Sequence, residues 1–142
     1  GRLWYKDNET RNNLMKKKYL IVVANYYQEI SQSLLDNALR SIPKLSLINI
    51  IKVPGVFEIP VTISKNINKY DAFLALGCVI KGQTPHFDFI SSATTNAIME
   101  LSVKSKKPIG NGVITCLNMR QAKARKNKGK EAARAVISIL NQ

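Results

Sequence analysis

The stretch Ala72–Ile80 constrains the fold of this chain more than any other segment. It reads Ala-Phe-Leu-Ala-Leu-Gly-Cys-Val-Ile, and none of these residues carries a charge. A half-exposed strand alternates apolar and polar residues, whereas a strand buried on both faces is a continuous hydrophobic run. The run therefore predicts a central strand of a parallel sheet that helices cover on both faces.

The chain leaves this run at Lys81-Gly82-Gln83 and then resumes as a helix. Thr84 suits the N-cap and Pro85 the first helical position, so His86 is expected in the first helical turn. Free backbone N–H groups at a helix start attract phosphate or carboxylate, and an imidazole exchanges protons near neutral pH. One interpretation is an anion site beside a proton-transfer group. The other is that Gly82 only makes the turn and His86 only caps or packs; spacing alone does not separate the two.

Strands and helices alternate along the rest of the chain. Further strands are expected at 19–24, 47–53 and 112–116, and helices at about 30–41, 58–67, 86–103, 119–126 and 130–140. This alternation predicts an α/β fold in which helices cover both faces of a parallel sheet, with right-handed crossovers. Ligands of such sheets bind beyond the carboxyl ends of the strands. The segments 25–27, 53–58, 79–86 and 116–119 reach that edge.

The composition of the chain limits which classes of ligand and partner are expected. The chain has 142 residues, which suit one domain, and a formal net charge of +13. Such a charge suggests an anionic partner, but scattered lysines also fit a solvated surface. No apolar run approaches the roughly 20 residues of a membrane span. Cys78 and Cys116 form no metal-binding pair, so no metal is expected, and buried free thiols favour a reducing compartment such as the cytoplasm.

The beginning of the chain differs from the rest. Residues 1–14 are mostly polar and show no periodicity, and Met15 is followed by three lysines, as at a translation start. No signal peptide is evident in these residues. We therefore expect a flexible N-terminal extension at 1–14 and the folded domain at 15–142.

Several side chains at the expected ligand edge suit a ligand with a ring and an anionic group. Tyr26 and Phe57 can hold a planar ring between them, although both also suit the rim of a core. Glu58 can accept hydrogen bonds from ligand hydroxyls, or can simply favour the positive end of its helix. No Walker or GxGxxG pattern indicates a cofactor. Free backbone N–H groups are expected from Gly82, Gln83 and Thr84, and positive charge from Lys81, Arg125 and Lys128.

Four motifs, in this order, resemble the lumazine synthase family: Val53–Pro60 (VPGVFEIP), Ala75–Ile90 (ALGCVIKGQTPHFDFI), Gly112–Thr115 with Gln121–Arg125, and Asn127–Gly129. The likeness extends from about residue 19 to 140, and the two longer motifs together are highly specific. It implies a flavodoxin-like three-layer α/β/α sandwich with a four-stranded parallel sheet. That fold agrees with the alternation of strands and helices.

The resemblance also implies an activity. Members condense 5-amino-6-(D-ribitylamino)uracil with 3,4-dihydroxy-2-butanone 4-phosphate to 6,7-dimethyl-8-ribityllumazine, the penultimate intermediate of riboflavin synthesis. An imine forms, phosphate is eliminated, and ring closure loses water, without a metal or organic cofactor. The implied partners are these small molecules and further copies of the chain, as a pentamer or a shell of pentamers, with neither nucleic acid nor a membrane.

The resemblance carries over to individual residues. His86 is similar to the general acid/base, and Tyr26 to the aromatic residue that stacks on the pyrimidine. Gln83 and Thr84 are similar to the phosphate-binding turn, and Arg125 to the arginine that holds the phosphate. The implied substrate contacts are Tyr26, Val56, Phe57, Glu58, Val79, Ile80, Lys81, Gln83, Thr84, Asn111, Arg125 and Lys128, with Lys128 near the pyrimidine carbonyl.

Two features depart from the family pattern. Many members have an aromatic residue at the position of Asn111, and an amide stacks poorly on a ring. The stretch between Arg125 and Asn127 is several residues shorter than in the family, which leaves open whether Arg125 and Lys128 both reach the site. In the family these late residues come from the neighbouring subunit.

Two other functions are compatible with the residues. A basic nucleic-acid-binding module fits the charge, but the chain has no RNP-type, KH or helix-turn-helix pattern. A relative that binds flavin or lumazine without catalysis would carry the same ring-binding residues. A fluorescence assay for lumazine formation separates this last case from the enzyme.

Overall fold

The computed structural model describes residues 16–142, and the expected extension at 1–14 lies outside them. The strands are β1 (Lys18–Ala24), β2 (Leu47–Val53), β3 (Ala72–Ile80) and β4 (Ile109–Cys116). The helices are α2 (Gln28–Ser41), α3 (Ile59–Lys65), α4 (Phe87–Ser105), α5 (Met119–Ala124) and α6 (Lys128–Leu140), with a 3-10 turn, η1 (Val56–Glu58).

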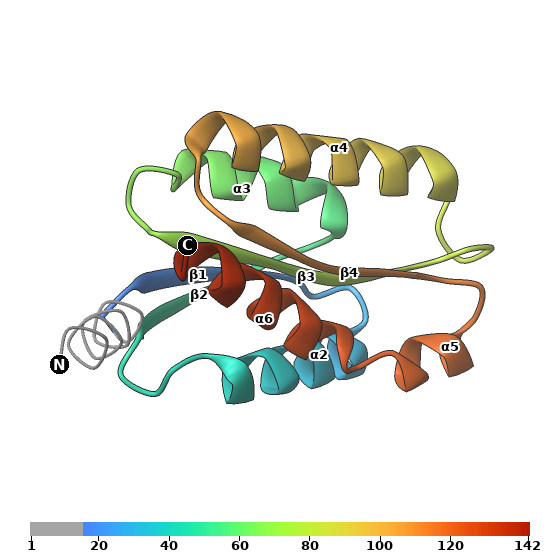
Figure 1. Cartoon of the computed structure of the whole chain (residues 1–142). Coiled ribbons are helices and arrows are strands. Elements are labelled where there is room, and N and C mark those ends of the chain that lie inside the picture. Colours follow the sequence, from blue (N-terminus) through green and yellow to red (C-terminus); the bar gives the residue numbers. More distant parts are fainter. Residues whose placement is uncertain (1–15) are drawn as a thin grey trace, which may run out of the picture.

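The strands form one parallel sheet in the order β2-β1-β3-β4. Figure 1 shows α3 and α4 above this sheet and α2, α5 and α6 below it. This arrangement confirms the predicted three-layer α/β/α sandwich. The chain passes from β1 to one side for β2 and then to the other side for β3, so the strand order reverses between β1 and β3. In flavodoxin-like sheets a ligand crevice opens at that reversal.

Strand β3 lies at the centre of the core, as its hydrophobic run predicted. Every residue of Ala72–Ile80 is buried. Leu74 and Leu76 belong to the core on the α2 and α6 side, whereas Phe73 and Ala75 belong to the core on the α3 and α4 side. Successive side chains of a strand point to opposite faces, so one strand supplies both cores.

The last helix begins earlier than the sequence predicted. Residues 127–129 were expected to interrupt the chain between two helices, but α6 starts at Lys128 and includes Gly129. A Cβ atom on Gly129 would collide with the backbone of Leu34 in α2. The glycine therefore allows two helices to pack closely, and it does not break a helix.

The other elements differ from prediction mainly at their ends. Helix α2 begins at Gln28 and not at residue 30, and β4 begins at Ile109 and not at 112. The earlier start of α2 follows from the N–H of Ser31, which donates to the carbonyl of Tyr27 at 2.9 Å. Such end effects are where sequence patterns carry least information.

Adding a methyl group at Gly129 tests the close packing of α6 on α2. Alanine favours a helix over glycine by roughly 1 kcal/mol, but here the collision with Leu34 should dominate. We expect Gly129→Ala to lower the free energy of unfolding in urea by about 1–3 kcal/mol. Lys130→Ala on the next position should change it by less than about 0.5 kcal/mol. Wild-type stability of Gly129→Ala would contradict the packing described.

Candidate active site

A cavity of about 190 Å³ opens at the reversal of strand order. Its walls come from the ends of β1 and β3, from η1 and from the turn that leads into α4. The lining residues are Tyr26, Tyr27, Gly55, Val56, Phe57, Cys78, Val79, Gln83, Thr84, Pro85 and Ile90. We call this space the β1–β3 cavity. The structure thus brings together the predicted contacts Tyr26, Val56, Phe57, Val79, Gln83 and Thr84.

Two aromatic rings flank the β1–β3 cavity. Tyr26 is 71% exposed and Phe57 is 64% exposed, so neither ring is part of the core. The ring of Tyr26 meets that of Tyr27 edge-on, with centroids 4.9 Å apart and an interplanar angle of 80°. Tyr26 stays largely exposed despite this contact. The cavity can therefore hold a planar heterocycle by stacking.

Tyr27 is a cavity residue that the sequence reasoning missed. It is half-buried against the core on the α2 side and its hydroxyl donates a hydrogen bond to Oε1 of Gln83 at 3.0 Å. Burial raises the pKa of this hydroxyl, and the neighbouring Thr84 side chain lowers it only in part. The hydroxyl therefore stays protonated at neutral pH and remains a donor. No sequence pattern indicates this pairing of residues 56 positions apart.

The turn that follows β3 folds back on its own strand. The N–H groups of Gln83 and Thr84 both donate to the carbonyl of Ile80, at 3.2 and 3.0 Å. Lys81 donates its N–H to the carbonyl of Cys116 at 2.9 Å. The prediction of free N–H groups at Gln83 and Thr84 was wrong, because the turn itself uses them. Their side chains remain at the cavity wall.

His86 precedes α4 and does not lie in its first turn, which corrects the sequence prediction. It is the N-cap residue, with left-handed backbone angles of φ 57° and ψ 40°, and it is exposed. The prediction of Thr84 as N-cap was wrong because the N–H of Thr84 turns back to Ile80, so the helix begins only at Phe87. A left-handed residue other than glycine costs roughly 1–2 kcal/mol and is uncommon.

Three predicted contacts adjoin the β1–β3 cavity without lining it. One carboxylate oxygen of Glu58 accepts the N–H of Gly55 at 3.1 Å and closes η1. This bond fits the structural interpretation of Glu58, and the second oxygen remains for a ligand. The side chain of Ile80 is buried in the core, and Lys81 is exposed.

The remaining predicted contacts lie at the free edge of β4, away from the β1–β3 cavity. A second cavity, of about 550 Å³, is lined by Thr95, Asn111, Val113, Ile114, Thr115, Ala124, Arg125, Asn127, Lys128 and Glu131. We call it the β4-edge cavity. The two cavities share no lining residue. Arg125 and Lys128 do line one cavity together, despite the short link between α5 and α6.

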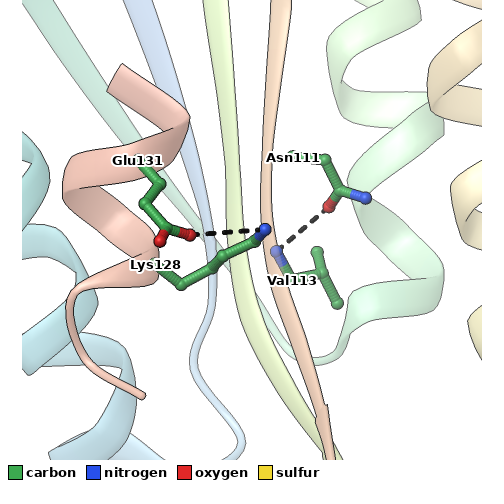
Figure 2. Close-up of polar contacts among 4 residues, drawn as sticks. All are labelled: Asn111, Val113, Lys128 and Glu131. Atoms are coloured by element: carbon green, nitrogen blue, oxygen red, sulfur yellow. Dashed lines mark hydrogen bonds and ion pairs between the residues drawn. The ribbon is translucent and has the colours of Figure 1, made fainter. Parts of the chain in front are cut away.

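Polar side chains of the β4-edge cavity are held by neighbours in the chain. Oδ1 of Asn111 accepts the N–H of Val113 at 3.1 Å, and Nζ of Lys128 lies 3.5 Å from Oε2 of Glu131 (Figure 2). Arg125 donates from Nη1 to the carbonyl of Thr115 at 2.8 Å. Since the carbonyl of Cys116 faces β3, residues 113 and 115 turn their backbone groups to the open edge of the sheet. Asn111 and Arg125 therefore satisfy backbone groups that no strand pairs.

Residues 16–142 contain no group of three or more histidine, cysteine, aspartate or glutamate side chains that could hold a metal ion. Within the same range, no helix is both long and apolar enough to span a bilayer.

Comparison with known proteins gives one consistent family. Residues 16–142 match the family model described as 6,7-dimethyl-8-ribityllumazine synthase. A protein of that name from Cutibacterium acnes is 39% identical over 132 residues, which cover 87% of this chain and 80% of the relative. The protein from Nitrobacter hamburgensis is 37% identical over 92% of this chain and 88% of its own length. The protein of that name from Agrobacterium fabrum is 38% identical over 89% of this chain and 95% of its own length.

Cys78 lines the β1–β3 cavity, and its thiol can be used to test how well this part of the cavity excludes water. Burial, with the adjacent Cys116, raises the pKa of its thiol from 9.0 to about 12. Between these values the unfolded chain releases the proton and the folded chain keeps it, so rising pH favours unfolding. From pH 8 to pH 10, the wild type should lose up to about 1.4 kcal/mol more unfolding free energy than Cys78→Ala.

Urea unfolding of both proteins at the two pH values measures this difference directly. Each protein serves as its own reference, so a constant cost of the substitution cancels. Parallel pH profiles of the two proteins would show that the thiol is not held protonated by its surroundings.

Proposed function

Because this chain belongs to the 6,7-dimethyl-8-ribityllumazine synthase family, we propose that its active site is completed between two copies of the chain. As a member of that family it is a transferase of riboflavin biosynthesis, and its reaction condenses the ribitylaminouracil with the phosphorylated butanone. The observation that carries the proposal is the division of the expected contacts between two cavities without a common lining residue. One copy supplies the β1–β3 cavity and its neighbour supplies the β4 edge.

The β1–β3 cavity binds the pyrimidine. Tyr26 stacks on its face and Phe57 closes the other side, which suits their exposure and their places after the neighbouring strands β1 and β2. Backbone groups near Val56, Val79 and Ile80 hydrogen-bond the ring edge. The oxygen of Glu58 that η1 does not use accepts from the ribityl hydroxyls.

The phosphate of the second substrate lies between the turn after β3 and the neighbouring copy. Because the N–H groups of Gln83 and Thr84 are occupied, their side chains make the contact, together with Lys81. Arg125 of the neighbour completes this site. Only one of its nitrogens is engaged with Thr115, so the guanidinium fork keeps donors for a phosphate.

Lys128 of the neighbour approaches the pyrimidine carbonyl, and Asn111 lies behind it at the same edge. The pair of Lys128 with Glu131 supports this role, because it is largely exposed and stabilises little. An exposed pair of this kind rearranges readily when a ligand arrives. The short link between α5 and α6 suits the shared site, since both cations already line one cavity.

His86 transfers protons during the reaction. The amine attacks the ketone and loses water to give the imine, phosphate is then eliminated, and ring closure releases a second water. These steps need an acid and a base near neutral pH, and holding both substrates in contact adds a further rate factor. His86 is exposed and directly follows the cavity residue Pro85, although it does not itself line the cavity. Its left-handed backbone supports a functional role, since such strain concentrates at active sites.

The complete enzyme is then a closed ring of copies. The receiving surface is the β1–β3 cavity of one copy, and the donating surface is the β4 edge of its neighbour. Because these two surfaces differ, each interface is head-to-tail. Head-to-tail contacts that close on themselves form a ring. We propose the pentamer that the resemblance implies. We also propose a cytoplasmic location, which the two free buried cysteines support.

His86→Asn tests the proton-transfer role without disturbing the backbone. Among residues with a side chain but no imidazole, asparagine is one of those that best tolerate left-handed angles, so the turn should persist. We expect turnover to fall by roughly 10²–10⁴-fold, measured by lumazine fluorescence, with the assembly size unchanged in light scattering. Turnover close to that of the wild type would remove His86 from the mechanism.

Mixing two inactive variants tests the two-copy site. His86→Asn damages the receiving surface and Arg125→Ala the donating one, so each assembly alone should be nearly inactive. After joint dissociation and reassembly in equal amounts, about a quarter of the sites combine two intact surfaces. Activity should return to about that share. Recovery no greater than the sum of the separate variants would contradict a site between copies.

A further inference from the structure

Tyr27 touches both ends of the proposed substrate site. Its ring packs edge-on against Tyr26 at 4.9 Å, and its hydroxyl donates to Oε1 of Gln83 at 3.0 Å. Tyr26 follows β1 and Gln83 follows β3, so this one side chain bridges the reversal of strand order. It therefore joins the residue proposed to stack on the pyrimidine to the residue proposed to contact the phosphate.

The turn after β3 has few other anchors to the receiving side of the site. Its backbone bonds run to Ile80 of its own strand and to Cys116 of β4. These bonds fix where the turn leaves the sheet, but they do not direct the side chain of Gln83, which is exposed. The bond from Tyr27 is the one that ties this side chain to the β1 side of the cavity.

Tyr27 is well suited to act as an anchor. It caps α2, its carbonyl accepts the N–H of Ser31 at 2.9 Å, and its ring packs on the core of the α2 side. A tyrosine has only two side-chain torsions, so little entropy is lost when it is held. Its hydroxyl therefore projects into the cavity from a rigid base.

We infer that Tyr27 is a positioning residue that, through Gln83, sets the distance between the stacking ring of Tyr26 and the phosphate end of the site. This inference rests on the proposed roles of Tyr26 and Gln83. The two substrates must meet with the amine and ketone in contact while ring and phosphate are each bound, so the spacing selects a phosphorylated ketone of matching length. Without the hydroxyl, the Gln83 side chain samples other rotamers and the phosphate end loosens.

Tyr27→Phe removes the hydroxyl and keeps the ring that packs on Tyr26. We expect KM for the phosphorylated ketone to rise roughly three- to ten-fold, about the effect of one net hydrogen bond. KM for the pyrimidine should stay within about two-fold of the wild type, because the hydrogen bond that is removed supports only the phosphate end of the site. The constant for competitive inhibition by inorganic phosphate should rise together with KM for the ketone.

Gln83→Met supplies the second arm of the experiment. It removes the acceptor, leaves Tyr27 in place, and keeps the inference testable if Tyr27→Phe does not fold. If Tyr27 acts through Gln83, the double variant should be no worse than Gln83→Met alone. Tyr70→Phe is the matched control, since it also removes a bonded hydroxyl, the one that accepts from Asn49 at 2.6 Å beside a cavity at the far end of the sheet. Its kinetic constants should match the wild type.

Several results would overturn the inference. Unchanged KM for the ketone in Tyr27→Phe, with a raised KM in Gln83→Met, would leave Tyr27 a packing residue. Additive losses in the double variant, or an equal rise in KM for the pyrimidine, would show that Tyr27 does not act through Gln83. Unchanged KM values in both single variants would also show that Gln83 does not contribute to the phosphate site. The proposed site between two copies would not be affected by that result, because the mixing experiment tests it separately.

Discussion

The burial of β3 on both faces is the constraint on which the rest of the structure depends. A fully buried strand needs neighbours on both sides and helices above and below, and parallel strands need crossover helices to return the chain. All four strands therefore end at one edge of the sheet. The residues that follow them meet there because of the strand order. The chemistry of the site is thus set by which side chains stand directly after each strand.

Close packing around β3 then shapes the cavity. A Cβ atom on Gly77 would lie 2.8 Å from Cγ1 of Val56 and 2.9 Å from Cβ of Ala24. The absence of that atom lets η1 lie against the end of β3, and this brings Phe57 to the same opening as Tyr26. The two aromatic rings of the site are thereby placed by a residue that does not line the cavity.

The sequence predicted the parts of the fold that depend on continuous apolar runs. The bounds of β3 were predicted as the structure has them. His86 was misplaced because the pattern of cap and proline did not account for the N–H of Thr84 bonding to Ile80. The link between Tyr27 and Gln83 had no sequence signal, since it depends on the lateral order of two strands.

The backbone contacts of Gly129 and Asn111 could not be predicted for a related reason. Residues 127–129 were predicted to interrupt the helices, but Gly129 lies within α6, and the backbone of Leu34 across the interface explains its lack of a side chain. Asn111 was expected to stack poorly on a ring, and the structure adds a backbone contact, since its Oδ1 accepts the N–H of Val113. In both cases the decisive contact is with backbone, and backbone positions are known only once the elements are packed.

The contacts of Asn111 and Arg125 along β4 have a consequence for the open edge of the sheet. Strand β4 lies at the edge of the sheet, and the outer side of an edge strand is a template for aggregation into fibrils. Here the chain covers an N–H and a C=O of that strand with its own side chains. The open edge of the sheet is thereby protected from pairing with the strands of other chains.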